Sequence, residues 1–424
     1  MSRLADAGLE PGRAPRARSS GFYYGWVVVG GAFLILFLAY GAQYAFGVFF
    51  AALLDEFGWS RTGLSGVFSL YAFLYCVFGL AAGQLTDRWG PRVVISLGGV
   101  FLGAGLAGMS QVRELWHPYV LYGVVAALGM STAYVPCNAT VVKWFVRKRG
   151  LAVGVASSGG SLGTFALPPL AHLLVGAVGW RWAYVAFGAA ILVILNLVAR
   201  VMKRDPELLG LAPNGAARSP APASANAEVR WPLPWAIRTA AFWTLFGVFA
   251  ATWIPVFIPL VHAVPFARDL GISPLLASTV VSALGIAAVF GRLVMGGISD
   301  RTGRKSALGI SIGLQGLAFL GFMAVGGLPA LYLVVVGFGF SYGAVSTLFP
   351  AIVGDFFGRE RAGSLVGFLF ALAGSMAALG PVGAGAIYDA TGRYTWAFLL
   401  SAGFNGLALL LLALARPPQA RAGF

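Results

Sequence analysis

Charged residues are scarce in this chain of 424 residues: Asp, Glu, Lys and Arg together make up 10% of it, while hydrophobic residues make up 59%. A soluble globular domain carries about 25% charged residues, so this composition excludes that class. The scarcity of charge instead predicts an integral membrane protein.

Cysteine and histidine are also scarce, with two and three copies. Cys76 and Cys137 both lie in apolar stretches and form neither a disulfide framework nor a zinc-binding spacing, so we expect free thiols. The apolar stretches hold no cluster of His, Asp and Glu and no pair of nucleophile and base. We therefore expect no metal, no cofactor and no enzymatic activity.

Long apolar runs, by contrast, recur along almost the whole sequence. A helix of about 20 apolar residues crosses the hydrocarbon layer of a bilayer. The chain is therefore predicted to be an all-α membrane protein with twelve transmembrane helices. The predicted spans are 24–50, 61–85, 92–110, 115–138, 150–173, 180–202, 240–264, 275–298, 305–325, 329–352, 363–387 and 393–415.

The positive charges are distributed unevenly. If the N-terminus lies in the cytoplasm, 23 of the 29 Lys and Arg residues fall in cytoplasmic segments, five in external loops and one, Arg292, inside the membrane. This positive-inside pattern predicts that both termini are cytoplasmic, in the plasma (cytoplasmic) membrane, which is the inner membrane of a cell that has two. Topology and contact with anionic lipid then account for the net charge of +15, and no nucleic-acid partner is expected.

The chain divides into two related halves. Residues 203–238 are rich in Ala, Pro, Asn and Ser, which is typical of a flexible linker. They separate a six-helix bundle at 24–202 from a second at 239–415, and cytoplasmic tails are predicted at 1–23 and 416–424. The segment GQLTDRWGPR at 83–92 returns as GGISDRTGRK at 296–305. This repetition indicates duplication, and two pseudo-symmetric bundles are typical of transporters that bind substrate between them at mid-membrane.

The repeated segment also resembles a known family. Asp87 and Arg88, like Asp300 and Arg301, can cap helix ends and form ion pairs, so we expect these four residues to form a cytoplasmic gate. The pattern Gly-x-Leu-x-Asp-Arg-x-Gly-x-Arg at 83–92 resembles the signature loop of the major facilitator superfamily. The resemblance implies the fold of that superfamily and says little about the substrate.

Other stretches resemble the monocarboxylate and oxalate:formate transporter branch of that superfamily. They are YYGWVVVGGAF at 23–33, YVPCNATVVKWF at 134–145, VHAVPFARDLGIS at 261–273 and FGRLVMGGISDR at 290–301. In that branch an arginine of the eighth span binds the substrate carboxylate, and Arg292 occupies the matching place. The resemblance also implies that Tyr134 and Tyr342, in the fourth and tenth spans, line the site.

The position of Arg292 supports this role independently of the resemblance. It precedes Asp300 by eight residues, or about 12 Å of helix, and so lies near the bilayer centre. A cation there costs about 2.5–3.5 kcal/mol on insertion scales, yet every Asp and Glu falls in a tail, a loop or a span end. We therefore expect a ligand carboxylate to pair with the guanidinium through two hydrogen bonds. The alternative is a structural Arg292 that backbone carbonyls and water satisfy.

Further polar side chains are candidates to complete the pocket by hydrogen bonding a second substrate oxygen. Asn138 follows Tyr134 by one helical turn and Ser346 follows Tyr342 by one turn, so each pair shares a helix face. The remaining candidates are Thr132 in the fourth span and Gln43 with its neighbour Tyr44 in the first.

A single intramembrane cation implies a substrate with a single carboxylate. Oxalate transporters of this branch place a second cation in the eleventh span, and residues 363–389 contain none, so we expect a small monocarboxylate of the lactate or pyruvate kind. An anion that enters against about 100 mV, inside negative, costs about 2.3 kcal/mol. Co-transport of a proton would compensate that charge, so the leading hypothesis is a proton-coupled symporter.

The proton route of animal relatives does not transfer directly, because they have an aspartate where Ala288 stands and a lysine in the first span, which has none here. His262, near the external end of its span, is the candidate for proton coupling or for an external gate. Asp269, beyond it, has Arg268 or a neighbouring cation as candidate partner. Two alternatives to a symporter stay open: an organic-anion exchanger or efflux carrier of the same superfamily, and a non-transporting carboxylate sensor.

Overall fold

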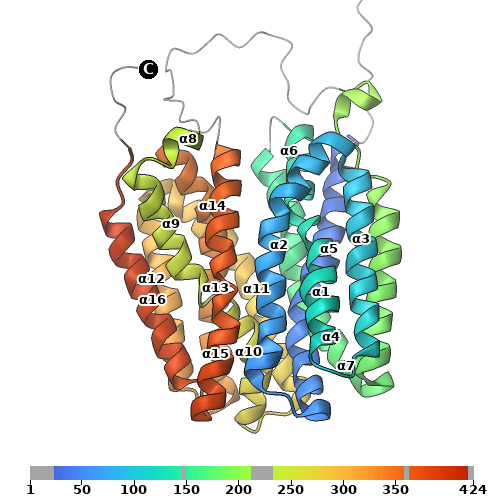
Figure 1. Ribbon diagram of the computed structural model, residues 1–424. Helices are drawn as coiled ribbons and strands as arrows, with labels where there is room; N and C mark the ends of the chain where they lie inside the picture. Colours follow the sequence, from blue (N-terminus) through green and yellow to red (C-terminus); the bar gives the residue numbers. More distant parts are fainter. Residues whose placement is uncertain (1–22, 146–148, 212–232, 358–361, 419–424) are drawn as a thin grey trace, which may run out of the picture.

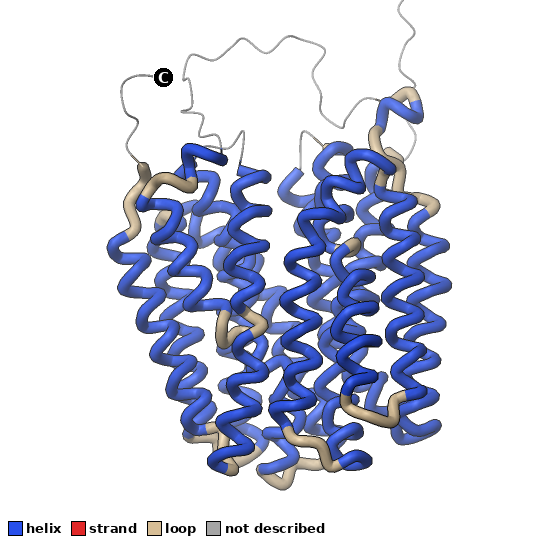
Figure 2. The backbone as a smooth tube through the Cα atoms, in the orientation of Figure 1, coloured by secondary structure: helices blue, strands red, loops and turns tan. Residues whose placement is uncertain are grey.

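The computed structural model describes residues 23–145, 149–211, 233–357 and 362–418. Every regular element in these ranges is helical, and no strand occurs in them (Figure 2). The predicted N-terminal tail, most of the linker, the last residues of the C-terminal tail and the side chains of Asp87 and Asp300 lie outside the described part.

The first half is built from long helices with two interruptions. In the fourth crossing, a π-helical stretch at Tyr119–Ala126 and a break after Ser131 divide the helix. In the fifth and sixth crossings, a continuous helical run turns at Gly179, whose φ of 78° suits glycine and few other residues. The helices are α1 (Gly25–Phe57), α2 (Arg61–Trp89), α3 (Pro91–Gly108), α4 (Trp116–Pro118), α5 (Ala127–Ser131), α6 (Tyr134–Trp144) and α7 (Arg149–Ala199).

The second half follows a short helix, α8 (Leu233–Ala236), and is again built from long helices, with interruptions in other crossings. Its first crossing is divided at residues 254–256, which include Pro255, because proline lacks the N–H that would continue the helix. Its fifth crossing is divided at residues 377–378. The helices are α9 (Ala240–Trp253), α10 (Phe257–Asp269), α11 (Pro274–Thr302), α12 (Arg304–Met323), α13 (Leu328–Phe357), α14 (Ala362–Met376), α15 (Leu379–Thr391) and α16 (Thr395–Leu414).

Within the described ranges, eleven helical segments are long and apolar enough to cross a membrane. One of them, Ala152–Ala199, has 48 residues, and its turn at Gly179 divides it into two crossings of about 30 Å or more. The prediction of an all-α membrane protein with twelve transmembrane helices is confirmed.

The helices stand side by side in two groups (Figure 1). We name the face where α1 begins and α16 ends the terminal face, and the opposite face, where α1 and α10 end, the distal face. The sequence predicts that the terminal face is cytoplasmic. In the first group α7 packs against α1 and α3, and in the second α13 packs against α11 and α12. The groups meet where α2 packs against α14 and α15, α1 against α10, and α7 against α11.

Glycines permit the close packing within each group. A Cβ atom at Gly163 of α7 would collide with the backbone oxygen of Phe37 on α1, and one at Gly291 of α11 would collide with that of Phe340 on α13. Small residues of this kind allow the backbones of membrane helices to touch.

We expect Gly163→Ala to destabilise the protein by about 1–3 kcal/mol, because its methyl group would force α7 away from α1. Gly176→Ala, in the same helix, is the matched control: nothing lies within 4 Å of its Cβ position, and alanine favours a helix over glycine by about 1 kcal/mol. The measurement is the midpoint of thermal unfolding in detergent. Equal midpoints for the two variants would contradict the proposed role of Gly163.

Candidate functional site

Arg292 lies near the middle of the membrane-crossing length of α11, on the side that faces the first half. Its Nη1 donates a long hydrogen bond of 3.3 Å to the backbone oxygen of Ser157 on α7, and its Nε is buried without a hydrogen-bond partner. Of the described carboxylates, none forms an ion pair with it. The guanidinium therefore has N–H donors that no described protein group uses.

Tyrosines approach Arg292 from the first half. The guanidinium interacts electrostatically with the hydroxyl groups of Tyr40 and Tyr44 on α1 and of Tyr134 at the start of α6. Tyr134 stacks on Phe370 of α14, with ring centroids 6.0 Å apart, and makes an edge contact with Tyr40. Although rings from both halves flank it, Tyr134 is 36% exposed, so it borders an open space inside the bundle.

Tyr342 of α13 completes this group from the second half. Its hydroxyl lies 2.9 Å from that of Tyr44, and either can be the donor. Because the bond joins α1 to α13, it places a polar centre at the boundary between the two halves. We name Arg292, Tyr40, Tyr44, Tyr134 and Tyr342 the central cluster.

Asn138 is hydrogen bonded to Tyr134 of the central cluster and to Ser157 of α7. Its Nδ2 donates to the backbone oxygen of Tyr134 at 3.0 Å, and its Oδ1 accepts from Ser157 Oγ at 3.2 Å. Ser157 is also the residue whose backbone oxygen receives the bond from Arg292. Asn138 thus ties α6 to the part of α7 that contacts the guanidinium.

Gln43 lies next to the cluster in the core of the first half and is 1% exposed. Its Oε1 accepts a hydrogen bond of 3.3 Å from Tyr71, and its Nε2 is buried without a partner. A buried amide donor without a partner costs free energy. The Nε2 of Gln43, the residue before Tyr44, is therefore free to donate a hydrogen bond.

The two remaining predicted pocket residues, Thr132 and Ser346, donate hydrogen bonds to backbone oxygens three residues earlier in the chain. Thr132 donates to the backbone oxygen of Gly129 and lies against Gly98 of α3. Thr132 lies in the break between α5 and α6, and its contact with Gly98 directs it toward α3. Ser346 lies one turn beyond Tyr342 and donates to Gly343 of its own helix.

The predicted cytoplasmic gate lies at the terminal face. Arg88 and Arg301 are in the last turns of α2 and α11, with exposed side chains. Because the side chains of Asp87 and Asp300 are outside the described part, their ion pairs stay a prediction.

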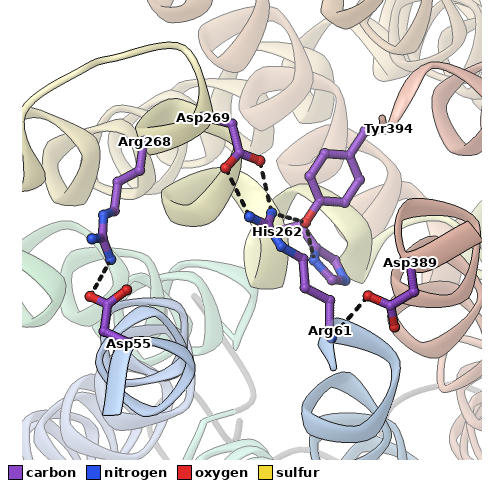
Figure 3. A network of polar contacts seen from close by, with 7 residues as sticks. All are labelled: Asp55, Arg61, His262, Arg268, Asp269, Asp389 and Tyr394. Carbon is purple, nitrogen blue, oxygen red and sulfur yellow. Dashed lines mark hydrogen bonds and ion pairs between the residues drawn. The ribbon is translucent and has the colours of Figure 1, made fainter. Parts of the chain in front are cut away.

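A polar network joins the two halves at the distal face (Figure 3). Arg61, the first residue of α2, binds both carboxylate oxygens of Asp269 on α10, at 2.9 and 2.8 Å. Its Nη1 also donates to Tyr394 Oη at 2.7 Å, and its guanidinium lies 3.8 Å from the ring centroid of Tyr388. Of the two candidate partners of Asp269, the neighbouring cation Arg61 forms the ion pair and Arg268 does not.

Two further contacts flank this pair. Asp389 of α15 accepts from the backbone N–H groups of Arg61 and Thr62 at 3.1 and 2.8 Å. It therefore caps the N-terminus of α2 from the other half, where a helix dipole favours a carboxylate. Arg268 pairs with Asp55 of α1 at 2.9 Å. We name Asp55, Arg61, Arg268, Asp269 and Asp389 the distal latch.

His262 of α10 lies beneath the latch and is 1% exposed. Its Nδ1 is 2.9 Å from Tyr394 Oη, and its Nε2 is 3.0 Å from the backbone oxygen of Pro381 and 3.2 Å from Ser65 Oγ. Burial raises the pKa of the Tyr394 phenol well above its ordinary value, so this hydroxyl keeps its proton. The predicted coupling histidine is thus hydrogen bonded to the latch through Tyr394.

The hydrogen bonds, ion pairs and ring contacts that join described residues of the two halves lie at the distal face and in the centre. Toward the terminal face, the last of them are the bond from Arg292 to Ser157 and the stacking of Tyr134 on Phe370. Beyond them, nothing lies within 4 Å of the Cβ positions of Gly154 on α7 and Gly367 on α14. Hydrogen bonds and ion pairs therefore join the halves at the distal side, and none of those between described residues joins them at the terminal side.

Comparisons with known proteins agree with this arrangement. The model of the Major Facilitator Superfamily matches residues 32–266 and again residues 256–424. Monocarboxylate transporter 4 of Rattus norvegicus is 28% identical over 388 residues, which cover 89% of this chain and 80% of that protein. Monocarboxylate transporter 11 of Homo sapiens is 30% identical over 393 residues, with the same two shares.

Two solved structures share the fold. The nucleoside transporter NupG has a TM-score of 0.71 at 15% identity, covering 93% of this chain and 100% of that one. A bacterial homologue of the human lysosomal transporter Spinster, in an inward-facing and unoccupied conformation, has a TM-score of 0.69 at 16% identity, covering 93% and 96%.

The bond between Tyr44 and Tyr342 predicts energetic coupling between the halves. Tyr44→Phe and Tyr342→Phe are expected to be non-additive by about 0.5–1.5 kcal/mol, because either one removes the same bond. Tyr332→Phe is the control, since Tyr332 bonds to Thr279 within the second half and should combine additively with Tyr44→Phe. The measurement is the unfolding free energy of the single and double variants, and full additivity of the first pair would contradict the coupling.

Proposed function

Because the chain belongs to the major facilitator superfamily and to its monocarboxylate transporter branch, we propose that it is a proton-coupled symporter of small monocarboxylates such as lactate or pyruvate. It is a transporter and not an enzyme. The finer proposal has three parts: Arg292 binds the substrate carboxylate, the two halves alternate in exposing it, and a proton accompanies it.

The observation that carries the proposal is the guanidinium of Arg292, which has a buried Nε without a partner and no described carboxylate beside it. A planar guanidinium matches a carboxylate with two parallel charge-assisted hydrogen bonds. Binding a carboxylate would satisfy the free donors and neutralise the charge. The bond of Arg292 to Ser157 and the bond of Tyr44 to Tyr342 both cross the boundary, which supports a site between the halves.

Neighbouring groups supply what a small hydroxy or keto acid needs. Tyr134 and Tyr342 would hydrogen bond the second carboxylate oxygen or the 2-oxygen of the substrate, and Asn138 would orient α6. The rings of Phe370 and Trp253, with centroids 5.4 Å apart, would contact the hydrocarbon part. A site with one cation and several neutral hydroxyl groups favours a monoanion over a dianion.

The distribution of contacts supports alternating access. Ion pairs and hydrogen bonds tie the halves at the distal face, whereas no ion pair or hydrogen bond between described residues ties them at the terminal face. With the predicted topology, in which the terminal face and both chain termini are in the cytoplasm of a cell's plasma membrane, this conformation faces inward. Basic residues of the terminal face would contact anionic lipid.

The role of Arg292 can be tested by uptake of radiolabelled lactate into proteoliposomes. Arg292→Ala is expected to lower uptake about tenfold or more, because charged hydrogen bonds of this kind contribute about 1.5–3 kcal/mol. Arg292→Lys should also be impaired, since an ammonium group lacks the planar fork. Arg113→Ala, at an exposed distal position, is the control and should transport normally. Full uptake by a folded Arg292→Ala protein would assign the residue a structural role.

Proton coupling separates the symporter from an exchanger. We expect an inward pH gradient alone to drive lactate accumulation in vesicles that contain no internal substrate, because the proton would compensate the charge of the anion. The measurement is accumulation with and without the gradient, and with and without lactate inside. Uptake that depends on internal substrate and ignores the gradient would identify an exchanger instead.

A further inference from the structure

The hydrogen bonds between the distal latch and His262 have a fixed direction. Arg61 is a donor only, so Tyr394 Oη must accept from it. The backbone oxygen of Pro381 is an acceptor only, so His262 must donate to it from Nε2. In the neutral imidazole Nδ1 is then the acceptor, and it receives the hydroxyl proton of Tyr394. Every group in this chain of contacts is satisfied.

A second proton on His262 is incompatible with that arrangement. Nδ1–H would have to donate to Tyr394 Oη, which already accepts from Arg61. The described side-chain partners of the Tyr394 hydroxyl are Arg61 and His262, and both would then be donors only. The phenol proton would lose its acceptor, and two cations would share one oxygen atom, so the contact between Arg61 and Tyr394 would be opposed.

The groups around the imidazole define the routes by which its charge can act on the latch. The groups that face it are Phe50 of α1, Arg61 and Ser65 of α2, Pro381 and Asp389 of α15, and Tyr394 before α16. Only Arg61 and Asp389 among them are charged. Asp389 is bound to the backbone of α2, which leaves Tyr394 as the link between the ring and the latch.

We propose that Tyr394 transmits the protonation state of His262 to Arg61, so that a neutral His262 holds the distal latch closed and a protonated His262 releases it. Arg61 and Tyr394 would then be coupling residues that act through His262 without touching the substrate. A carrier that had bound a proton and no anion would stay open on the distal side, which would prevent it from carrying protons alone.

This inference deepens the proposed proton coupling, and it can be tested without any substrate. Spin labels at Gln111→Cys and Gly326→Cys, exposed distal positions in opposite halves, would report the distance between the halves after Cys76→Ser and Cys137→Ser. We expect the ratio of distal-open to distal-closed molecules to rise as the pH falls from 8 to 5.5, by up to about tenfold per pH unit for one linked proton. A ratio that ignores pH would overturn the proposal.

Three variants test which residues cause the pH response of the distal opening. Tyr394→Phe keeps the ring and removes the hydroxyl, so the pH response should shrink several-fold. His262→Gln should abolish it, and would still decide the matter if Tyr394→Phe failed to fold. Asp55→Asn removes an ion pair between the halves that does not involve Tyr394 or His262. It should raise the open fraction at every pH and keep the response.

Two outcomes would contradict the mechanism: an unchanged pH response in Tyr394→Phe or His262→Gln, or its loss in Asp55→Asn. Lactate uptake by the same proteins separates this result from the proposed function. Failure of the latch would leave gradient-driven uptake and its dependence on Arg292 intact, whereas failure of the transport proposal would abolish uptake and leave the distance measurement valid.

Discussion

A guanidinium that no described carboxylate pairs with, inside an apolar helix bundle, is the constraint on which the middle of this structure depends. A charge in hydrocarbon is unfavourable unless it is paired or solvated, and Arg292 has one long bond to a backbone oxygen and a buried Nε without a partner. The fold accommodates it by placing it at the boundary between two halves, among hydroxyl groups and an open space. A site of this kind suits an anion that enters and leaves.

The halves are joined by close backbone contacts at glycines, as at Gly285 against Ser161 and Gly385 against Arg61, and at the distal face also by ion pairs and hydrogen bonds. Inside each half, glycines let helix backbones touch, as between α11 and α13, and such seams hold a fixed geometry. Between the halves, the distal face relies on ion pairs and hydrogen bonds that water can replace. The pair of Arg268 and Asp55 is partly exposed to solvent, and such pairs contribute little net free energy, so this contact can form in one state and break in another. The fixed seams and the replaceable latch together suit two rigid bodies that rock.

This chain has Ala288 on α11 and no lysine on α1, the two places where the resemblance to animal transporters predicts charges for proton transfer. The distal network contains the groups that such a route requires. His262 is joined through Tyr394 to Arg61, and Arg61 to Asp269. On the mechanism proposed above, proton coupling in this chain lies at the gate and carboxylate binding at the centre, so the two tasks belong to different layers of the bundle.

The amino-acid sequence by itself determined the membrane class and the twelve spans, and it predicted that Arg292 lies apart from every Asp and Glu, because hydropathy and charge act along a helix and need no knowledge of its neighbours. It did not determine which faces meet. Thr132 turned toward Gly98 and away from the cluster, since α6 begins after a break that sets its own phase. Tyr44 met Tyr342, Arg61 met Asp269 and His262 met Tyr394 only through the packing of helices from opposite ends of the chain. A periodic pattern reports which face of a helix is apolar, but the partner across the interface depends on the rotation and depth of both helices, and those are decided by tertiary packing alone.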